Sequence, residues 1–220
     1  MKLVSSTLGQ RSPRGRDWRA VRYRKMLSAA IEVMQGRGSR DISMDEIARS
    51  AGVGKATLYR YFHTKQGLLR ACLEGIVEDL GARMERAEAA DAGAPQRLAQ
   101  IVELMVDTFS HHLLPLRVLT HRQGELDREW RRSVQDARRR LVSVLGRHFR
   151  RGAQEGFYRE VDAELVPHLI MGMIRSAVTH TTGLSNAAIS AQIVDFVLRA
   201  SRLEARAPQA APECSVDATR

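Results

Sequence analysis

The sequence predicts an all-α fold in two parts, an N-terminal three-helix domain containing a helix-turn-helix and a larger C-terminal helical domain. Apolar residues recur at spacings of three and four along almost the whole chain, which is the period of an amphipathic helix. No segment alternates convincingly between apolar and polar residues as a half-buried strand does, and no Asn-Gly pair marks a hairpin. The 220 residues suffice for a small domain joined to a larger one.

Residues 1–16 form a basic arm without apolar periodicity, which we expect to be flexible. The first helix is predicted from Asp17, acting as N-cap, to Gln35. Its apolar face comprises Leu27, Ala30, Ile31 and Met34. Gly36 and Gly38 then end the helix.

A helix-turn-helix is predicted over residues 43–62. Ser43 and Glu46 have the capping-box spacing that begins a helix. The apolar stripe of this helix consists of Met44, Ile47, Ala48 and Ala51. Gly52 can adopt the left-handed conformation that ends it, and Gly54 opens a second helix after only a few residues. A pair of helices joined by so short a turn is typical of the motif.

The second helix of the motif presents a basic and aromatic face. Leu58 and Phe62 lie four residues apart and face inward. The outward positions are Ala56, Tyr59, Arg60 and His63, with Gly54 and Lys55 at the leading end. Such a helix lies in the major groove of DNA with its first residues toward base edges. Phosphate oxygens are expected within reach of flanking residues: Thr57, Tyr59, Tyr61 and Lys65.

Positive charge is concentrated around this motif. Residues 1–70 hold 15 Lys and Arg against 5 Asp and Glu, whereas residues 71–220 hold 20 of each sign. The formal net charge of +10 therefore belongs to the first third of the chain. A basic module of this size favours a polyanionic partner, because each cation that neutralises a phosphate releases condensed counterions.

The helix-turn-helix lies within a longer segment, Met26 to Leu69, that resembles a known family. This segment is about a fifth of the chain. The segments that carry the resemblance are Ser43-Met44-Asp45-Glu46-Ile47-Ala48, Ala51-Gly52-Val53, Thr57-Leu58-Tyr59-Arg60-Tyr61-Phe62 and Lys65. In this register the chain resembles the TetR (tetracycline-repressor-type) family. The resemblance implies a three-helix DNA-binding domain over residues 17–65, a variable helical domain that binds ligand and dimerises, and usually repression that a small molecule relieves.

The resemblance also assigns contacts to a double-stranded DNA operator. It places base contacts on Lys55, Ala56, Thr57, Tyr59, Arg60 and Tyr61, and phosphate contacts on Ser43 and Lys65. Three positions depart from the family pattern: Gly54 stands where Ser or Thr is common, Ala56 where Gly is common, and Met34 where an aromatic residue is usual. Operator preference therefore cannot be copied from the family.

Residues 66–204 are predicted to form the ligand-binding and dimerisation domain. A helix continues from Lys65 through Leu80 and should connect the two domains. A linker at 89–95 precedes helices near 96–113, 115–122, 127–151, 162–182 and 186–203. Arginines in the helix at 127–151 intermix with acidic residues, which favours a solvated helix face over a nucleic-acid stripe. The Ala-, Pro- and Glu-containing tail at 205–220 is expected to be disordered.

The last two predicted helices have broad apolar faces, from which we predict a homodimer. Gly172 and Ser176, four apart, would let another helix approach closely. The second helix adds Ile189, Ile193, Phe196 and Ala200 to the predicted interface. Two such pairs could form an intermolecular four-helix bundle, although burial within one chain would produce the same pattern. Two-fold pairing would place recognition helices about 34 Å apart and predicts a palindromic operator.

A pocket for an unidentified small-molecule effector is expected among the middle helices. Its candidate residues are Met105, Phe109, His112, Trp130, Val134, Met171 and His180. Each would equally suit an ordinary core at helical spacing. The pair His111-His112 is not interpreted as a metal site, because adjacent helical residues diverge by about 100° and no spaced Cys or carboxylate supports them. No cofactor is expected.

Composition and the absence of certain motifs limit which other classes of protein the sequence could represent. Hydrophobic residues make up 44% of the chain, charged ones 27% and aromatic ones 5%, as in soluble globular proteins. The absence of a signal-like start and of any long apolar run predicts a cytoplasmic protein without a membrane partner. Cys72 and Cys214 lack CxxC spacing, which suits a reducing compartment. No catalytic motif favours an enzyme, and a DNA-architectural protein without ligand control stays the second alternative.

Overall fold

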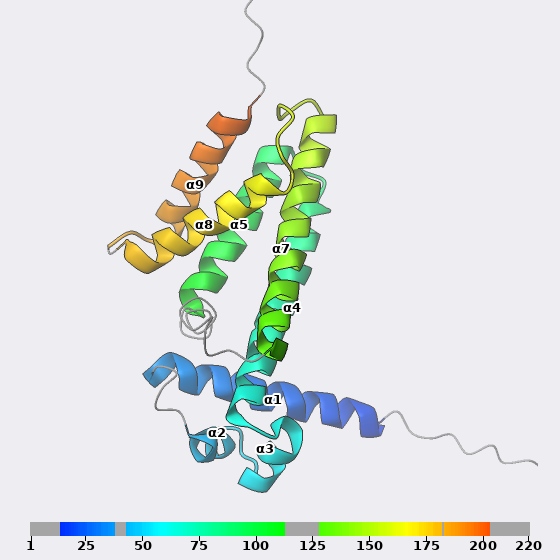
Figure 1. The fold of residues 1–220 in the computed structure, drawn as a ribbon, viewed down its shortest axis with the longest axis vertical. Coiled ribbons are helices and arrows are strands. Elements are labelled where there is room, and N and C mark those ends of the chain that lie inside the picture. Colours follow the sequence, from blue (N-terminus) through cyan, green and yellow to red (C-terminus); the bar gives the residue numbers. More distant parts are fainter. Residues whose placement is uncertain (1–13, 38–42, 113–127, 182, 203–220) are drawn as a thin grey trace, which may run out of the picture.

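The computed structural model describes residues 14–37, 43–112, 128–181 and 183–202. Its helices are α1 (Arg14–Arg37), α2 (Met44–Ser50), α3 (Lys55–Phe62), α4 (Lys65–Glu88), α5 (Ala94–His111), α7 (Arg128–Gln154), α8 (Leu165–His180) and α9 (Asn186–Ser201). In Figure 1, α1 crosses one end of the molecule with α2 and α3 beneath it, and α4 rises from there into the larger helical domain. Across the described residues the β-structure is one isolated bridge, so the all-α prediction is confirmed.

Two helices, α1 and α5, begin earlier in the chain than the sequence predicts. The chain is already helical at Arg14, so Asp17 lies within α1 and is not its N-cap. Pro95, predicted as part of the linker, occupies the first turn of α5, where proline is tolerated because its missing amide would have no partner within the helix. Most of the predicted arm, the tail at 205–220 and the predicted helix at 115–122 lie outside the described residues.

The N-terminal helices share a small core. Apolar residues of α1 pack against the inward faces of α2 and α3, and α4 closes the cluster. Its fully or largely buried members include Met26, Ala30, Met34, Ile47, Ala48, Leu58, Phe62, Leu68 and Cys72. Small residues of α1 and α2 allow these helices to approach closely, and the result is a compact support for α3.

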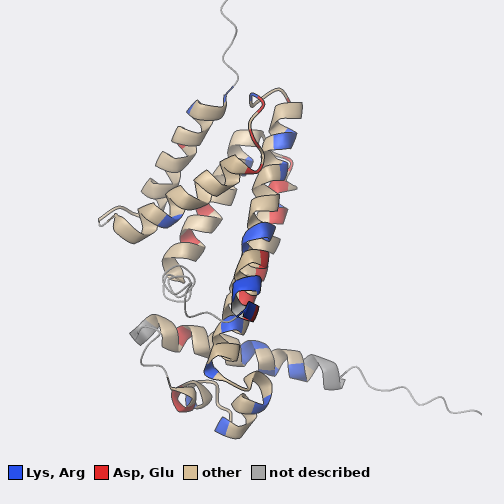
Figure 2. Ribbon diagram, viewed as in Figure 1, with Lys and Arg blue, Asp and Glu red and all other residues tan. Residues whose placement is uncertain are grey.

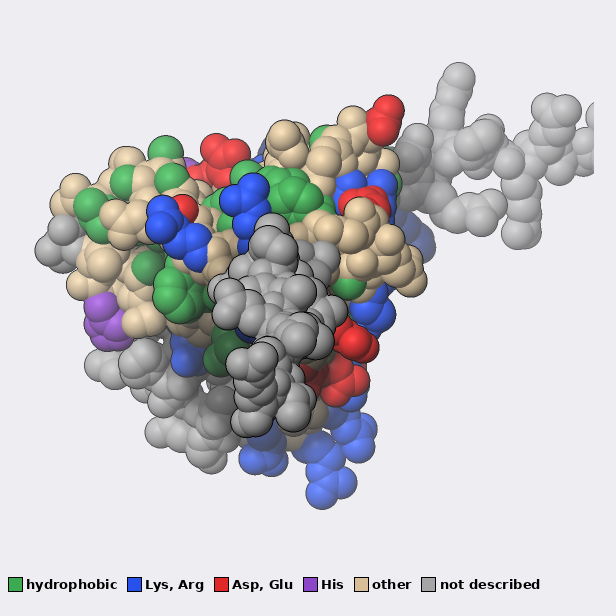
Figure 3. Space-filling model, turned by 90° about the horizontal axis from the view of Figure 1, so that it is seen from above, with side chains coloured by type: hydrophobic (Ala, Val, Ile, Leu, Met, Phe, Trp, Pro, Cys, Tyr) green, Lys and Arg blue, Asp and Glu red, His purple; other side chains and the backbone are tan. Residues whose placement is uncertain are grey.

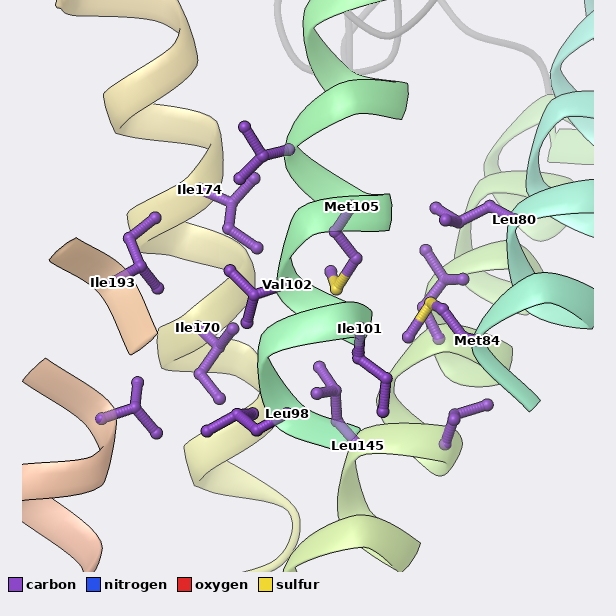
Figure 4. Packing of buried hydrophobic residues seen from close by; sticks show 14 of the residues in the cluster. Leu80, Met84, Leu98, Ile101, Val102, Met105, Leu145, Ile170, Ile174 and Ile193 are labelled. Atoms are coloured by element: carbon purple, nitrogen blue, oxygen red, sulfur yellow. The ribbon is translucent and has the colours of Figure 1, made fainter. Parts of the chain in front are cut away.

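The C-terminal helices enclose a second, larger core. Figure 4 shows side chains of α4, α7, α8 and α9 packing with those of α5, and it labels Leu80, Met84, Leu98, Ile101, Val102, Met105, Leu145, Ile170, Ile174 and Ile193. All are less than a tenth exposed. α5 is therefore the central helix of this domain.

α4 belongs to both cores. Leu68, Ala71 and Cys72 near its start pack with the N-terminal cluster. Leu73, Val77, Leu80 and Met84 farther along the helix belong to the C-terminal cluster, and Leu69 contacts both. The two domains are further linked where the Gln35 side chain of α1 donates to the His111 carbonyl of α5, with 3.0 Å between nitrogen and oxygen.

A buried polar cluster lies at the end of the C-terminal domain farthest from α3. His148 is fully buried, and its Nδ1 is 2.6 Å from the Glu88 carboxylate while its Nε2 is 2.9 Å from the Tyr158 hydroxyl. Burial lowers the pKa of His148, with Glu88 opposing the effect. A carboxylate can only accept, so Nδ1 is the donor in the contact with Glu88. The nearly buried Arg97 adds a 2.7 Å bond to Glu155 and approaches Glu88 at 3.7 Å.

Replacing Gly67 by alanine is expected to destabilise the N-terminal domain by about 3 kcal/mol, at the upper end of overpacking costs. A Cβ at this position would lie 2.3 Å from the Phe62 carbonyl oxygen, a backbone atom that cannot rotate away. Urea unfolding followed by circular dichroism measures the loss. Gly81→Ala in the same helix is the matched control, since nothing lies within 4 Å of its Cβ position and alanine favours helix. Equal stability of the two variants would contradict the steric argument.

Candidate nucleic-acid interface

The turn between α2 and α3 has the geometry that the glycine at its centre predicts. The Ser43 hydroxyl accepts from the Glu46 amide at 3.1 Å and begins α2 as expected. At its other end Gly52 has a φ of 64°, the left-handed region. The Gly52 and Val53 amides donate to the carbonyls of Arg49 and Ala48 at 3.1 and 2.9 Å, which is a Schellman cap. The helix-turn-helix is thus fixed by its own backbone hydrogen bonds.

α3 is held by two apolar side chains and leaves its other faces open. Leu58 is fully buried and Phe62 is 6% exposed. Gly54, Lys55, Ala56, Tyr59, Arg60 and His63 are exposed, and Thr57 and Tyr61 are partly buried. Tyr59 is notable because 40% of this large aromatic side chain is exposed on a helix so short. Figure 2 shows Lys and Arg along α1 and α3, whereas α2 carries Asp45 and Glu46 as well as Arg49.

Lys55 at the start of α3 is paired with a residue of α2. Its ammonium group donates to the Asp45 carboxylate at 2.8 Å, and this hydrogen bond raises the pKa of Lys55. Both side chains are more than half exposed, so the pair is weak in energy but defines a position for the charge. The spacing of ten residues between Asp45 and Lys55 gives no periodic signal, and sequence reasoning missed the pair.

The flanking residues differ in how far they are committed to the fold. The Tyr61 ring packs beside both Tyr23 and Phe62, with centroid distances of 6.4 and 6.2 Å, so only part of the ring is available. Ser43 uses its oxygen as a cap acceptor, which leaves the hydroxyl proton free to donate to a phosphate. Lys65 is partly buried in the first turn of α4, beside the Thr64 cap.

The turn from α3 to α4 contains a feature that sequence reasoning missed. His63 has a φ of 57°, an uncommon conformation for a residue other than glycine. The Thr64 hydroxyl then accepts from the Gly67 amide at 2.9 Å and begins α4. Only two residues separate the helices, so Gly67 must lie against the end of α3.

The predicted ligand residues are only partly brought together. Met105 is fully buried and belongs to the core around α5 that Figure 4 shows. Phe109, Val134 and Met171 are half-buried and pack on the same core. His112 lies near the N-terminal domain, 3.5 Å from the Gln35 amide nitrogen, and burial lowers its pKa. His180 is exposed on the last turn of α8, and the Trp130 side chain lies outside the described residues.

The pockets formed by described residues have other linings. A groove of about 450 Å³ lies between α4 and α7, where Val77, Gly81 and Val144 meet Arg140 and Arg147. Arg147 is paired with Glu85 across it. Figure 3, which views the molecule from the C-terminal domain's end, shows basic and acidic side chains interspersed with hydrophobic ones. The pairing of Arg139 with Asp136 and of Arg147 with Glu85 favours the solvated-face interpretation of the α7 arginines.

The predicted dimer residues divide between two faces. Ile189 and Ile193 are 6% and 7% exposed and point into the core of their own chain, so their assignment to a free surface is corrected. Ser176, Phe196 and Ala200 are exposed, and Gly172 has open space around it. Leu165 and Leu169, at 54% and 55% exposure, extend the α8 stripe of Gly172 and Ser176, and sequence reasoning missed both.

Neither a metal-binding cluster nor a membrane-spanning helix is found in the described parts of the chain. No group of three or more His, Cys, Asp or Glu side chains lies close enough together there to hold a metal ion. No helix within those residues combines the length and apolar character needed to cross a membrane.

Comparison with known proteins identifies both domains. Residues 26–72 match the model of bacterial regulatory proteins of the tetR family, and residues 91–201 match that of the tetracyclin repressor-like C-terminal domain. The fatty acid metabolism regulator protein of Bacillus subtilis is 27% identical over 161 residues, covering 72% of this chain and 82% of the relative.

Solved structures share the fold. The transcriptional regulator FadR from Bacillus subtilis in complex with stearoyl-CoA has a TM-score of 0.69 at 24% identity, covering 80% of this chain and 97% of FadR. AibR in complex with isovaleryl coenzyme A and operator DNA has a TM-score of 0.62 at 22% identity, with 80% and 97% coverage. The two family models together span both described domains, and the chain therefore belongs to the tetR family of bacterial transcriptional regulators.

Proposed function

We propose that the protein is a homodimeric repressor that binds a palindromic operator and leaves it when a small molecule occupies the C-terminal domain. The observation that carries the proposal is α3, a short helix anchored by Leu58 and Phe62 whose exposed face holds Lys55, Tyr59 and Arg60. This arrangement matches a recognition helix for the major groove. The concentration of net positive charge in residues 1–70 supports the same partner.

The test is competition between DNA sequences at physiological salt. We expect the wild-type protein to select one palindromic sequence from a random duplex library, and to prefer it over random DNA by about a thousandfold or more. Equal binding to both would support the architectural alternative and contradict the regulator proposal.

The effector class is proposed from the relatives. FadR and AibR were solved with stearoyl-CoA and isovaleryl coenzyme A, so acyl-CoA thioesters of long and short chain length are the first probes. A true effector should raise the melting temperature of the free protein and release it from the selected operator. Free coenzyme A is the control for the acyl group. If no acyl-CoA does either, this effector class is wrong, although the DNA-binding proposal stands.

The dimer is proposed to form through α8 and α9. Their outward faces carry few charges in Figure 2 and expose Leu165, Leu169 and Phe196 to solvent in the single chain. Large exposed apolar side chains on adjacent helices are typical of protein interfaces. Pairing two copies would cover them and place the two α3 helices in successive grooves.

Replacing Phe196 by glutamate is expected to dissociate the dimer at micromolar concentration. The substitution would bury a carboxylate against an apolar surface, at a cost of several kcal/mol for each copy. Analytical ultracentrifugation gives the mass directly. Ala82→Glu, on the exposed surface of α4, adds the same charge and should leave the dimer unchanged. A dimeric Phe196→Glu variant would place the interface elsewhere.

A further inference from the structure

The first half of α1 carries a group of cations that the helix-turn-helix does not use. Arg19, Arg24 and Lys25 are exposed and Arg22 is partly exposed. Among the described residues none of the four has an ion pair with an acidic side chain. Figures 1 and 2 show this half of α1, with its Lys and Arg residues, extending past α2 and α3. Unpaired cations so close together repel one another, and an anionic partner would relieve that repulsion.

The register of α1 gives two of these cations a direction. Arg19, Arg22, Met26 and Ala30 occupy positions i, i+3, i+7 and i+11, which form one stripe along a helix. Met26 and Ala30 are fully buried against the N-terminal core. Arg19 and Arg22 therefore lie on the same face of α1 as these core residues, toward the N-terminal end of the helix. Tyr23, next to this stripe, contacts Tyr61 and Phe62, so this side of α1 faces the α3 side of the domain.

An exposed aromatic residue orders one of the arginines. The Arg22 guanidinium lies over the Trp18 ring, 4.1 Å from its centroid, and Trp18 is 55% exposed. Such a contact holds the planar group in place before binding, which reduces the entropy lost when it donates to an anion. Guanidinium groups match phosphate oxygens in a bidentate geometry.

We propose that Arg19 and Arg22 bind backbone phosphates of operator DNA beside the groove that α3 enters, with Trp18 positioning Arg22. The inference rests on the proposed function, because it extends the same DNA interface from α3 to α1. These contacts carry no base specificity, so they add affinity for any duplex in equal measure.

The experiment measures how affinity for the selected operator falls with salt concentration. Each lost phosphate contact reduces the slope of log affinity against log salt by about 0.9, and a dimer loses two contacts for each substitution. Arg19→Ala and Arg22→Ala should therefore each reduce the slope by about 1.8. Affinity for random DNA should fall by the same factor as affinity for the operator. Arg19→Lys should retain the slope, because it keeps the charge.

Arg24→Ala is the matched control. It removes the same charge from the same helix, but residue 24 lies roughly 140–200° around the axis from Arg19 and Arg22. Its slope should equal that of the wild type. If the three alanine variants have the same salt slope while the wild type still selects its operator, the proposed contacts of Arg19 and Arg22 are contradicted. The proposed function is then unaffected. If the wild type selects no operator, the proposed function fails independently of α1.

Discussion

Replacing Tyr59 by alanine is expected to weaken operator binding at least 30-fold while leaving the dimer and the fold intact. Tyr59 lies on the outward face of α3, and Leu58 and Phe62 supply the packing of that helix. Each lost base contact costs about 1–3 kcal/mol, and a dimer loses two, or about 2–6 kcal/mol. Fluorescence anisotropy with the selected operator measures the change.

Tyr59→Phe separates the ring from its hydroxyl. If the ring contacts a base or sugar, the phenylalanine variant should retain most of the affinity, and if the hydroxyl donates to DNA it should behave like alanine. Binding to random DNA should change much less than binding to the operator in either variant. Undiminished operator binding by Tyr59→Ala would move the recognition surface away from the centre of α3.

Replacing Arg97 by alanine is expected to destabilise the protein by about 3–5 kcal/mol, the usual cost of breaking a buried ion pair from one side. Only 2% of the Arg97 side chain is exposed, and its guanidinium group bonds to Glu155 and to the Ala92 carbonyl. Its removal leaves the largely buried Glu88 with less compensation for its charge. Urea unfolding at one fixed protein concentration measures the loss.

Arg139→Ala provides the comparison for Arg97. Arg139 is also ion-paired, to Asp136, but its side chain is 75% exposed. Solvent screens such a pair, so the variant should lose less than about 1 kcal/mol. Similar losses at the two positions would mean that burial does not set the strength of these pairs.

Local signals predicted the helix-turn-helix well. Ser43 capping, the left-handed Gly52 and the inward Leu58 and Phe62 all depend on residues within four positions of one another. The conformation of such segments is set mainly by their own backbone and side chains. The Gly67 contact with Phe62 was missed because it depends on how tightly two helices turn, which residue type alone does not encode.

Long-range contacts were predicted less well. Helical spacing grouped Ile193 with Phe196, yet the first is buried and the second is 62% exposed, because the axis of α9 decides which edge of an apolar stripe meets the core. In the cluster of Glu88, His148 and Tyr158, Glu88 contacts His148 although the two lie 60 positions apart in the sequence. No periodicity relates such residues, so only the packed helices bring them together.

Because α4 packs in both cores, a movement of one domain at this helix is transmitted to the other. The 24 residues of α4 span about 36 Å at about 1.5 Å per residue. A tilt of about 5° at the Glu88 end would move the Lys65 end by about 3 Å, and opposite movements in a dimer would change the separation of the recognition helices by about 6 Å. Two successive major grooves lie about 34 Å apart, and each is about 12 Å wide. A change of about 6 Å in the separation is therefore about half of a groove width. The effector of the proposed function would therefore need to tilt α4 by only a few degrees to move both recognition helices out of register with the DNA.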